Sequence, residues 1–185
     1  MNRGYSFKNF SYISFGRIIA TGLQAIFYLI FALLLSTEQY GQMSYLIAIA
    51  GTFSVIFRFG LPHTISVYQA KKDQVTSNQV NTLAIITTSI GSIILLFIDP
   101  LSAILSLSIS FLMMNLYNLL GLKNYKKHAL VDIIKSVLVI ILPIILFFIL
   151  EIPGILLGIA ISNFLGSFHF LKKINFKIQG FNKIR

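Results

Sequence analysis

Four ionisable side chains stand inside stretches that are otherwise apolar, and they are the residues best suited to bind a charged ligand. Arg17 and Arg58 carry guanidinium groups, while Asp132 and Lys135 follow each other at a spacing of three residues. Such a spacing puts two side chains on neighbouring faces of a helix. A guanidinium pairs with two phosphate oxygens at once. Together these residues predict a cationic vestibule for a phosphate or pyrophosphate headgroup.

Each of the basic residues also has a purely structural interpretation. The long side chain of an Arg or Lys near the end of a membrane helix can lift its charge to the lipid headgroups. Asp132 is too short for this, so its structural alternative is an ion pair with Lys135, Arg17 or Arg58. The residue types alone leave both interpretations open.

Uncharged polar residues lie deeper in the apolar stretches. They are Gln24, Asn115, Asn118 and Asn163, and the middle two are three residues apart and nearly co-facial. This placement predicts side chains that line a hydrated cavity and bind sugar hydroxyls. Hydrogen bonds between helices explain the same residues equally well.

The composition excludes a soluble domain. Of the 185 residues, 56% are hydrophobic and 11% are charged, whereas a soluble domain carries about 25% charged residues. Cysteine is absent, which removes disulfides and thiol chemistry. The sequence contains no G-x-x-x-x-G-K-[ST], H-E-x-x-H or G-x-S-x-G motif, and its acidic residues are scattered. We therefore expect no enzyme activity, no cofactor and no metal site.

The fold class predicted is an all-α integral membrane protein with six transmembrane helices, since each crossing needs about 20 apolar residues. The expected spans are residues 12–35, 42–61, 80–98, 100–121, 129–150 and 152–171. The predicted organisation is a cytoplasmic or interfacial segment at 1–11, a membrane domain at 12–171 and a basic cytoplasmic tail at 172–185.

The charges predict the orientation. Three short turns contain Glu38, Asp99 and Glu151 but no Lys or Arg, and all 15 basic residues fall at or near the other ends of the spans. Cytoplasmic loops retain Lys and Arg, so both termini are expected in the cytoplasm, with the protein in the cell membrane. The net charge of +10 then reflects topology and contact with the anionic lipid bilayer, and we expect no nucleic-acid partner.

The last span carries a stripe of small residues at a spacing of four. It consists of Gly154, Gly158, Ser162 and Gly166. Small residues let membrane helices approach closely. We expect the stripe to pack against other helices of the chain, with a dimer interface as the alternative.

Several short motifs resemble a known family. Residues 33–41 (LLLSTEQYG) are similar to the L-x-x-E-x-Y-G turn between the first two helices of lipid-linked oligosaccharide flippases. Residues 57–62 (FRFGLP) and 65–70 (ISVYQA) resemble the glycine-leucine end and the continuation of the family's second helix. Residues 5–17 look like its opening. These flippases form the polysaccharide-transport branch of the multidrug/oligosaccharidyl-lipid/polysaccharide exporter superfamily.

The resemblance implies two six-helix lobes around a cavity that opens alternately to either side. The six spans predicted in this chain resemble the N-terminal lobe, so a fragment or a half-transporter with a second six-span lobe or chain is expected. The implied function is flipping of a polyprenyl-pyrophosphate-linked oligosaccharide across the membrane. The alternatives are a small multispan exporter of a drug-like or metabolite solute and a membrane subunit without transport activity.

Overall fold

The computed structural model describes the backbone of residues 3–171 and the side chains of residues 11–168, and this part of the chain contains helices and no strand. The helices are α1 (Arg3–Leu34), α2 (Thr37–Arg58), α3 (Leu61–Ala70), α4 (Gln74–Leu96), α5 (Pro100–Gly121) and α6 (Tyr125–Leu171). Five of them are long and apolar enough to cross a membrane. The predicted all-α membrane fold is confirmed.

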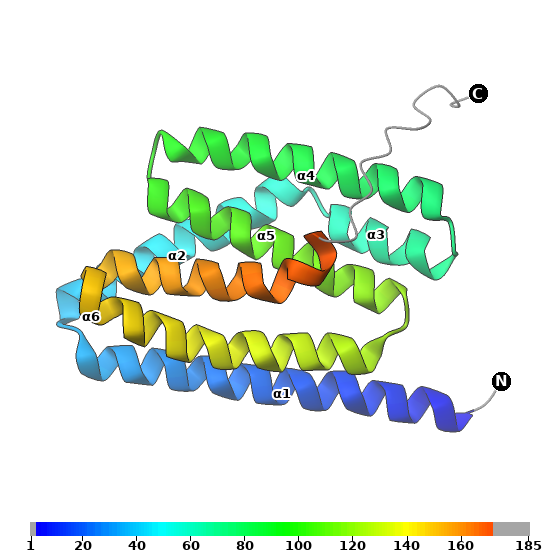
Figure 1. Cartoon of the computed structure of the whole chain (residues 1–185), viewed down its shortest axis with the longest axis horizontal. Helices are drawn as coiled ribbons and strands as arrows, with labels where there is room; N and C mark the ends of the chain where they lie inside the picture. Colours follow the sequence, from blue (N-terminus) through cyan, green and yellow to red (C-terminus); the bar gives the residue numbers. More distant parts are fainter. Residues whose placement is uncertain (1–2, 172–185) are drawn as a thin grey trace.

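The longest helix, α6, supplies two crossings. Its 47 residues are interrupted at Glu151, whose φ of 54° and ψ of −134° are not helical, and Figure 1 shows the chain folding back on itself there. Pro153 follows in the first turn of the second half, where a proline is tolerated because its missing N–H has no helical partner. The predicted turn that contains Glu151 therefore consists of this single non-helical residue.

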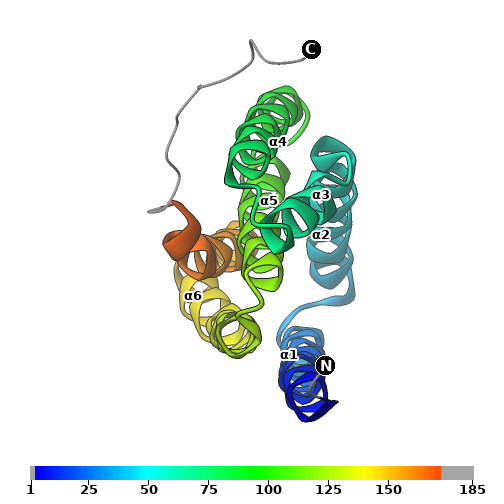
Figure 2. The same ribbon diagram turned by 90° about the vertical axis from the view of Figure 1, so that its right-hand side faces the viewer.

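The helix α5 lies at the centre of the bundle. It contacts α6 on one side and α2, α3 and α4 on the other, while α1 packs mainly against α6 (Figure 2). The serines of α5 at positions 102, 106 and 110 are all buried, and so are Ala84, Thr88 and Ser92 on α4. Small side chains at these contacts bring the backbones close together, which is how helices associate in lipid.

Two helices begin earlier than hydropathy alone predicts, because polar residues cap them. Ser36 accepts a hydrogen bond from the Gln39 backbone N–H, and the Gln39 side chain bonds back to Ser36, so α2 starts at Thr37 rather than at residue 42. Asp73 caps α4 by accepting a hydrogen bond from the Thr76 backbone N–H, so α4 starts at Gln74 rather than at residue 80. Hydrogen bonds from the side chain and backbone of Thr76 hold the pKa of the Asp73 carboxyl below its usual range.

The second span ends in a sharp break. Phe59 and Gly60 both adopt left-handed backbone conformations, with φ of 46° and 71°, and Pro62 follows in the first turn of α3. This break changes the direction of the chain between α2 and α3, and α3 then packs against α4 and α5.

The two ends of the bundle carry different charges. The turns that contain Glu38, Asp99 and Glu151 lie together at one end, and the segments that contain Lys71, Lys72 and residues 123–127 lie at the other (Figure 1). We call them the acidic end and the basic end. The helix α1 runs without interruption from Arg3, so the described residues of the segment predicted at 1–11 belong to the same helix as the first span. The basic tail predicted at 172–185 lies outside the described residues.

The small-residue stripe of the last span faces into the molecule. A Cβ at Gly158 would lie 2.5 Å from the backbone nitrogen of Pro143, and one at Gly154 would meet the carbonyl oxygen of Leu146. A Cβ at Gly166 would lie 2.9 Å from Leu112 on α5, and Ser162 is fully buried. The stripe therefore packs the two halves of α6 against each other and against α5.

This packing predicts that Gly158→Leu will destabilise the bundle. A larger side chain would press against backbone rather than against a movable side chain, so we expect a loss of about 3 kcal/mol, the upper end for an overpacked core. Thermal unfolding in detergent measures the effect. Gly22→Leu on α1 is the matched control, since a Cβ there meets nothing within 4 Å. Equal melting temperatures for the two variants would contradict the packing role.

Candidate functional site

Two adjoining cavities lie between α1 and α2, over α5 and α6. The larger has a volume of about 590 Å³, and its lining includes Gly60, His63 and His128, on the side of the inner cavity that is nearer the basic end; we call it the basic-end cavity. The smaller, of about 220 Å³, extends toward the middle of the bundle; we call it the inner cavity. Arg17, Met113 and Leu116 line both. The two spaces therefore share a wall.

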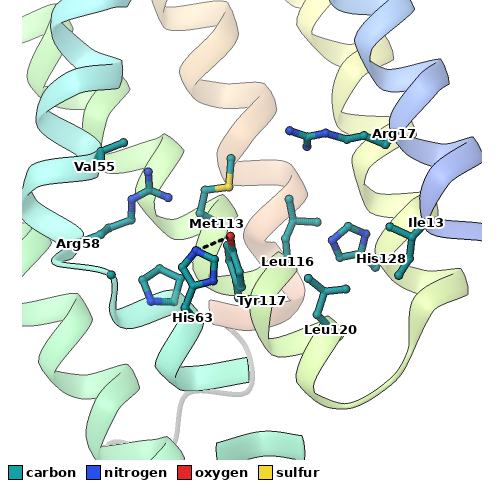
Figure 3. Close-up of a pocket in the computed structure, with 12 residues that line it drawn as sticks. Ile13, Arg17, Val55, Arg58, His63, Met113, Leu116, Tyr117, Leu120 and His128 are labelled. Carbon is teal, nitrogen blue, oxygen red and sulfur yellow. Dashed lines mark hydrogen bonds between the residues drawn. The ribbon is translucent and has the colours of Figure 1, made fainter. Parts of the chain in front are cut away.

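Guanidinium groups face each other across the basic-end cavity. Arg17 reaches in from α1 and Arg58 from α2, and both point toward the space between them in Figure 3. Arg58 is half-buried, and its Nε donates to the Ser54 carbonyl oxygen at 2.7 Å. That bond fixes the side chain while leaving other N–H groups of the fork available to a ligand.

Arg17 owes its position to a close helix contact. Its neighbour Gly16 lies so near Ala129 on α6 that an added Cβ would come within 2.7 Å of the Ala129 Cβ. This approach places Arg17 beside Asp132, with 3.7 Å between its Nη1 and the Asp132 Oδ2. Lys135 lies on the other side of the carboxylate, with its Nζ 4.0 Å from Oδ1.

The four predicted headgroup residues are therefore divided between the two cavities. Arg17 and Arg58 line the basic-end cavity, and Arg17, Asp132 and Lys135 line the inner one. Of the ion pairs considered for Asp132, the structure forms those with Lys135 and Arg17.

The four predicted cavity-lining residues separate into two groups. Gln24 and Asn163 line the inner cavity, and the Asn163 amide also donates to Ser108 Oγ at 3.2 Å. Asn115 and Asn118 line neither of the two cavities; they form hydrogen bonds between helices. Asn115 donates to the carbonyl oxygen of Gly166 at 2.8 Å.

Asn118 is the centre of a buried polar network that joins three helices. Its amide nitrogen donates to Asn81 Oδ1 on α4 at 3.1 Å, and its own Oδ1 accepts from Gln69 Nε2 on α3 at 3.1 Å. A buried amide with all these partners stabilises the packing of α3, α4 and α5. Of the two alternatives for Asn118, lining a cavity and forming hydrogen bonds between helices, the structure therefore shows the second.

Three further residues line the basic-end cavity and were not predicted from the sequence as site residues: His63, Tyr117 and His128. The Tyr117 hydroxyl and His63 Nε2 lie 3.0 Å apart, and this pair is drawn as a dashed line in Figure 3. His128 is buried on α6, one turn before Asp132. That spacing of four was the available signal, because it places both residues on one helix face. The α2–α3 break positions His63.

Comparison with known proteins identifies the family of the chain. The chain matches, over residues 6–184, a family described as polysaccharide biosynthesis protein. The chain belongs to this family. The resemblance drawn from residues 5–72 is thereby confirmed, and the match extends to nearly the whole chain. We conclude that this member of the polysaccharide biosynthesis protein family is a multi-pass membrane protein.

One curated relative is the uncharacterized membrane protein MJ1375 of Methanocaldococcus jannaschii. It is 28% identical over 194 aligned positions, which cover 94% of this chain and 46% of the relative. The chain thus spans about half the length of that relative. No solved structure matches the chain significantly.

The polar network predicts a clear separation between structural and ligand-binding residues. Asn118→Ala removes the partners of Asn81 and Gln69, and leaving buried polar groups unpaired costs about 1–3 kcal/mol. We expect a lower melting temperature with unchanged anion binding by the folded fraction. Asn78→Ala, at an exposed asparagine of α4, is the matched control. Weaker anion binding in Asn118→Ala with an unchanged melting temperature would contradict this assignment.

Proposed function

We propose that this chain forms one lobe of a flippase that moves a lipid-linked oligosaccharide, carried on polyprenyl pyrophosphate, across the cell membrane. The observation that carries the proposal is the pair of guanidinium groups, Arg17 and Arg58, on opposite walls of one cavity. Each can form a two-pronged contact with phosphate oxygens. The polysaccharide biosynthesis family supports a substrate of this class.

The lining of the cavity suits an amphiphile. Val55, Met113, Leu116 and Leu120 share the basic-end cavity with the arginines, so a charged head and an apolar tail would both find partners. An apolar drug-like solute is the second candidate, since the same side chains would accommodate it. The two candidates differ in whether the arginines matter for binding.

The proposed role is transport rather than catalysis. Alternating access in a transporter built from repeats would involve a second six-helix lobe, in the same polypeptide or in another chain. In such transporters one repeat commonly rocks against the other around a central site.

The charge distribution supports a cytoplasmic location of the basic end. Lys and Arg at the ends of spans favour the cytoplasmic side, and the cations of the vestibule would then face the cytoplasmic leaflet. In this orientation both termini are cytoplasmic and the cell membrane is the expected location.

Substitution of Arg58 tests the headgroup contact. Arg58→Gln should weaken binding of a short-chain prenyl diphosphate sugar by about tenfold or more, because a hydrogen bond to a charged group is worth about 1.5–3 kcal/mol. Arg58→Lys keeps the charge but loses the planar fork, so it should also be impaired. Binding is measured with the purified chain in lipid nanodiscs. Lys126→Gln, at an exposed lysine of the basic end, is the control.

A triple variant tests most directly whether the three cations bind one ligand. If Arg17, Arg58 and Lys135 share one ligand, their substitutions by Gln will be non-additive. Wild-type affinity in the triple Gln variant, at matched protein levels, would refute the vestibule. Binding of an apolar solute that is insensitive to these substitutions would favour the second candidate.

The orientation has its own test, which the absence of cysteine makes simple. Single cysteines at Glu38 and Ile98, both exposed at the acidic end, should react with an impermeant reagent added to intact cells. Cysteines at Lys71 and Lys126, exposed at the basic end, should react only after the membrane is opened. The reverse pattern would invert the proposed topology.

A further inference from the structure

Asp132 differs from a carboxylate that serves only to hold a structure together. Its side chain is 4% exposed, yet its ion pairs with Arg17 and Lys135 are 3.7 and 4.0 Å long. Within the described part of the chain, Oδ2 is buried and accepts no hydrogen bond. Buried carboxylates are normally held by short hydrogen bonds. Both contacts of Asp132 are therefore loose.

The two cations that Asp132 pairs with also face the cavities. The Arg17 side chain is 67% exposed and lines both spaces, and Lys135 lines the inner one. Figure 3 shows the Arg17 guanidinium directed into the basic-end cavity. Arg17 thus has two places where an anion can meet it: the buried carboxylate behind it and a ligand in front of it.

We propose that Asp132 competes with the ligand for Arg17 and Lys135. The carboxylate loses its contacts with these two cations when an anionic headgroup binds, and it regains them when the headgroup leaves. This inference rests on the proposed function, because it assumes an anionic headgroup in the vestibule. Asp132 would be a positioning residue that acts through Arg17 and does not touch the ligand.

The electrostatics explain why a carrier gains from such a residue. A site that moves a charged ligand must bind it well enough to capture it and weakly enough to release it. The three cations Arg17, Arg58 and Lys135, which line two adjoining cavities, would hold a diphosphate strongly, since charges interact more strongly away from water. One fixed carboxylate behind two of them weakens that hold. It also offsets the repulsion between Arg17 and Lys135 when the site is empty.

The test is equilibrium and kinetic binding of a prenyl diphosphate sugar whose two phosphates are both esterified, so that its charge stays fixed near neutral pH. The full chain is used in nanodiscs. Asp132→Asn should bind this probe about tenfold more tightly, a typical coupling between close charges, mainly through slower dissociation. Asp132→Glu keeps the competing charge and should behave like wild type. Asp132→Ser is a second neutral variant if Asn does not fold.

A double-mutant comparison identifies the residue through which Asp132 acts. In an Arg17→Gln background, Asp132→Asn should tighten binding much less than it does in the wild type. Unchanged or weaker binding by folded neutral variants would overturn the inference, and so would equal tightening in both backgrounds. If the wild type binds the probe but Arg17→Gln and Arg58→Gln have no effect, the proposed function itself fails, and the two failures are thereby distinguished.

Discussion

The bilayer interior offers no water, and the arrangement of the helices follows from that constraint. Every buried polar group must find a partner within the protein, and apolar surface gains little by leaving lipid for another helix. Close contact between helix backbones therefore stabilises the bundle, as a hydrophobic core stabilises a soluble protein. The serines buried along α5 and the stripe from Gly154 to Gly166 provide this contact. The same constraint explains why Gln69, Asn81 and Asn118 bond to one another rather than standing alone.

Hydropathy predicts the number of crossings because a segment inside the bilayer must be apolar. It misplaces the ends of the helices because those ends are defined by polar residues. The starts of α2 and α4 depend on Ser36 and Asp73, polar residues that a search for apolar runs leaves out. The reversal at Glu151 follows from the predicted boundary between the spans 129–150 and 152–171, but the tightness of this turn depends on the contact between Gly158 and Pro143, which are 15 residues apart in the sequence.

The site was predictable in its charges and not in its neutral residues. Arg17, Asp132 and Lys135 stand out because a charge inside a span is rare and needs a partner, and the structure brings the three together. The four amide residues have no such signature. Whether Asn118 or Asn163 lines a cavity depends on which helix lies opposite, and that is decided by packing. His63 enters the cavity wall only because Phe59 and Gly60 turn the chain.

The helices are packed unevenly. The charged cluster of Arg17, Asp132 and Lys135 lies where close packing between helices is replaced by the cavities. The helices α5 and α6 are joined closely, whereas α1 is held mainly by α6 and meets α2 only weakly. At the acidic end α1, α2 and α6 share an apolar cluster that includes Phe27, Phe31 and Met43. Further along, the cavities separate α1 from α2. Asp132 and Lys135 lie on α6, which packs closely against α5, and Arg17 lies on α1, which packs against α6 but has few contacts with α2. The ion pair between Arg17 and Asp132 joins α1 to α6 beside the cavities, so an anion that replaces Asp132 would change how α1 is held as well as how the ligand is bound.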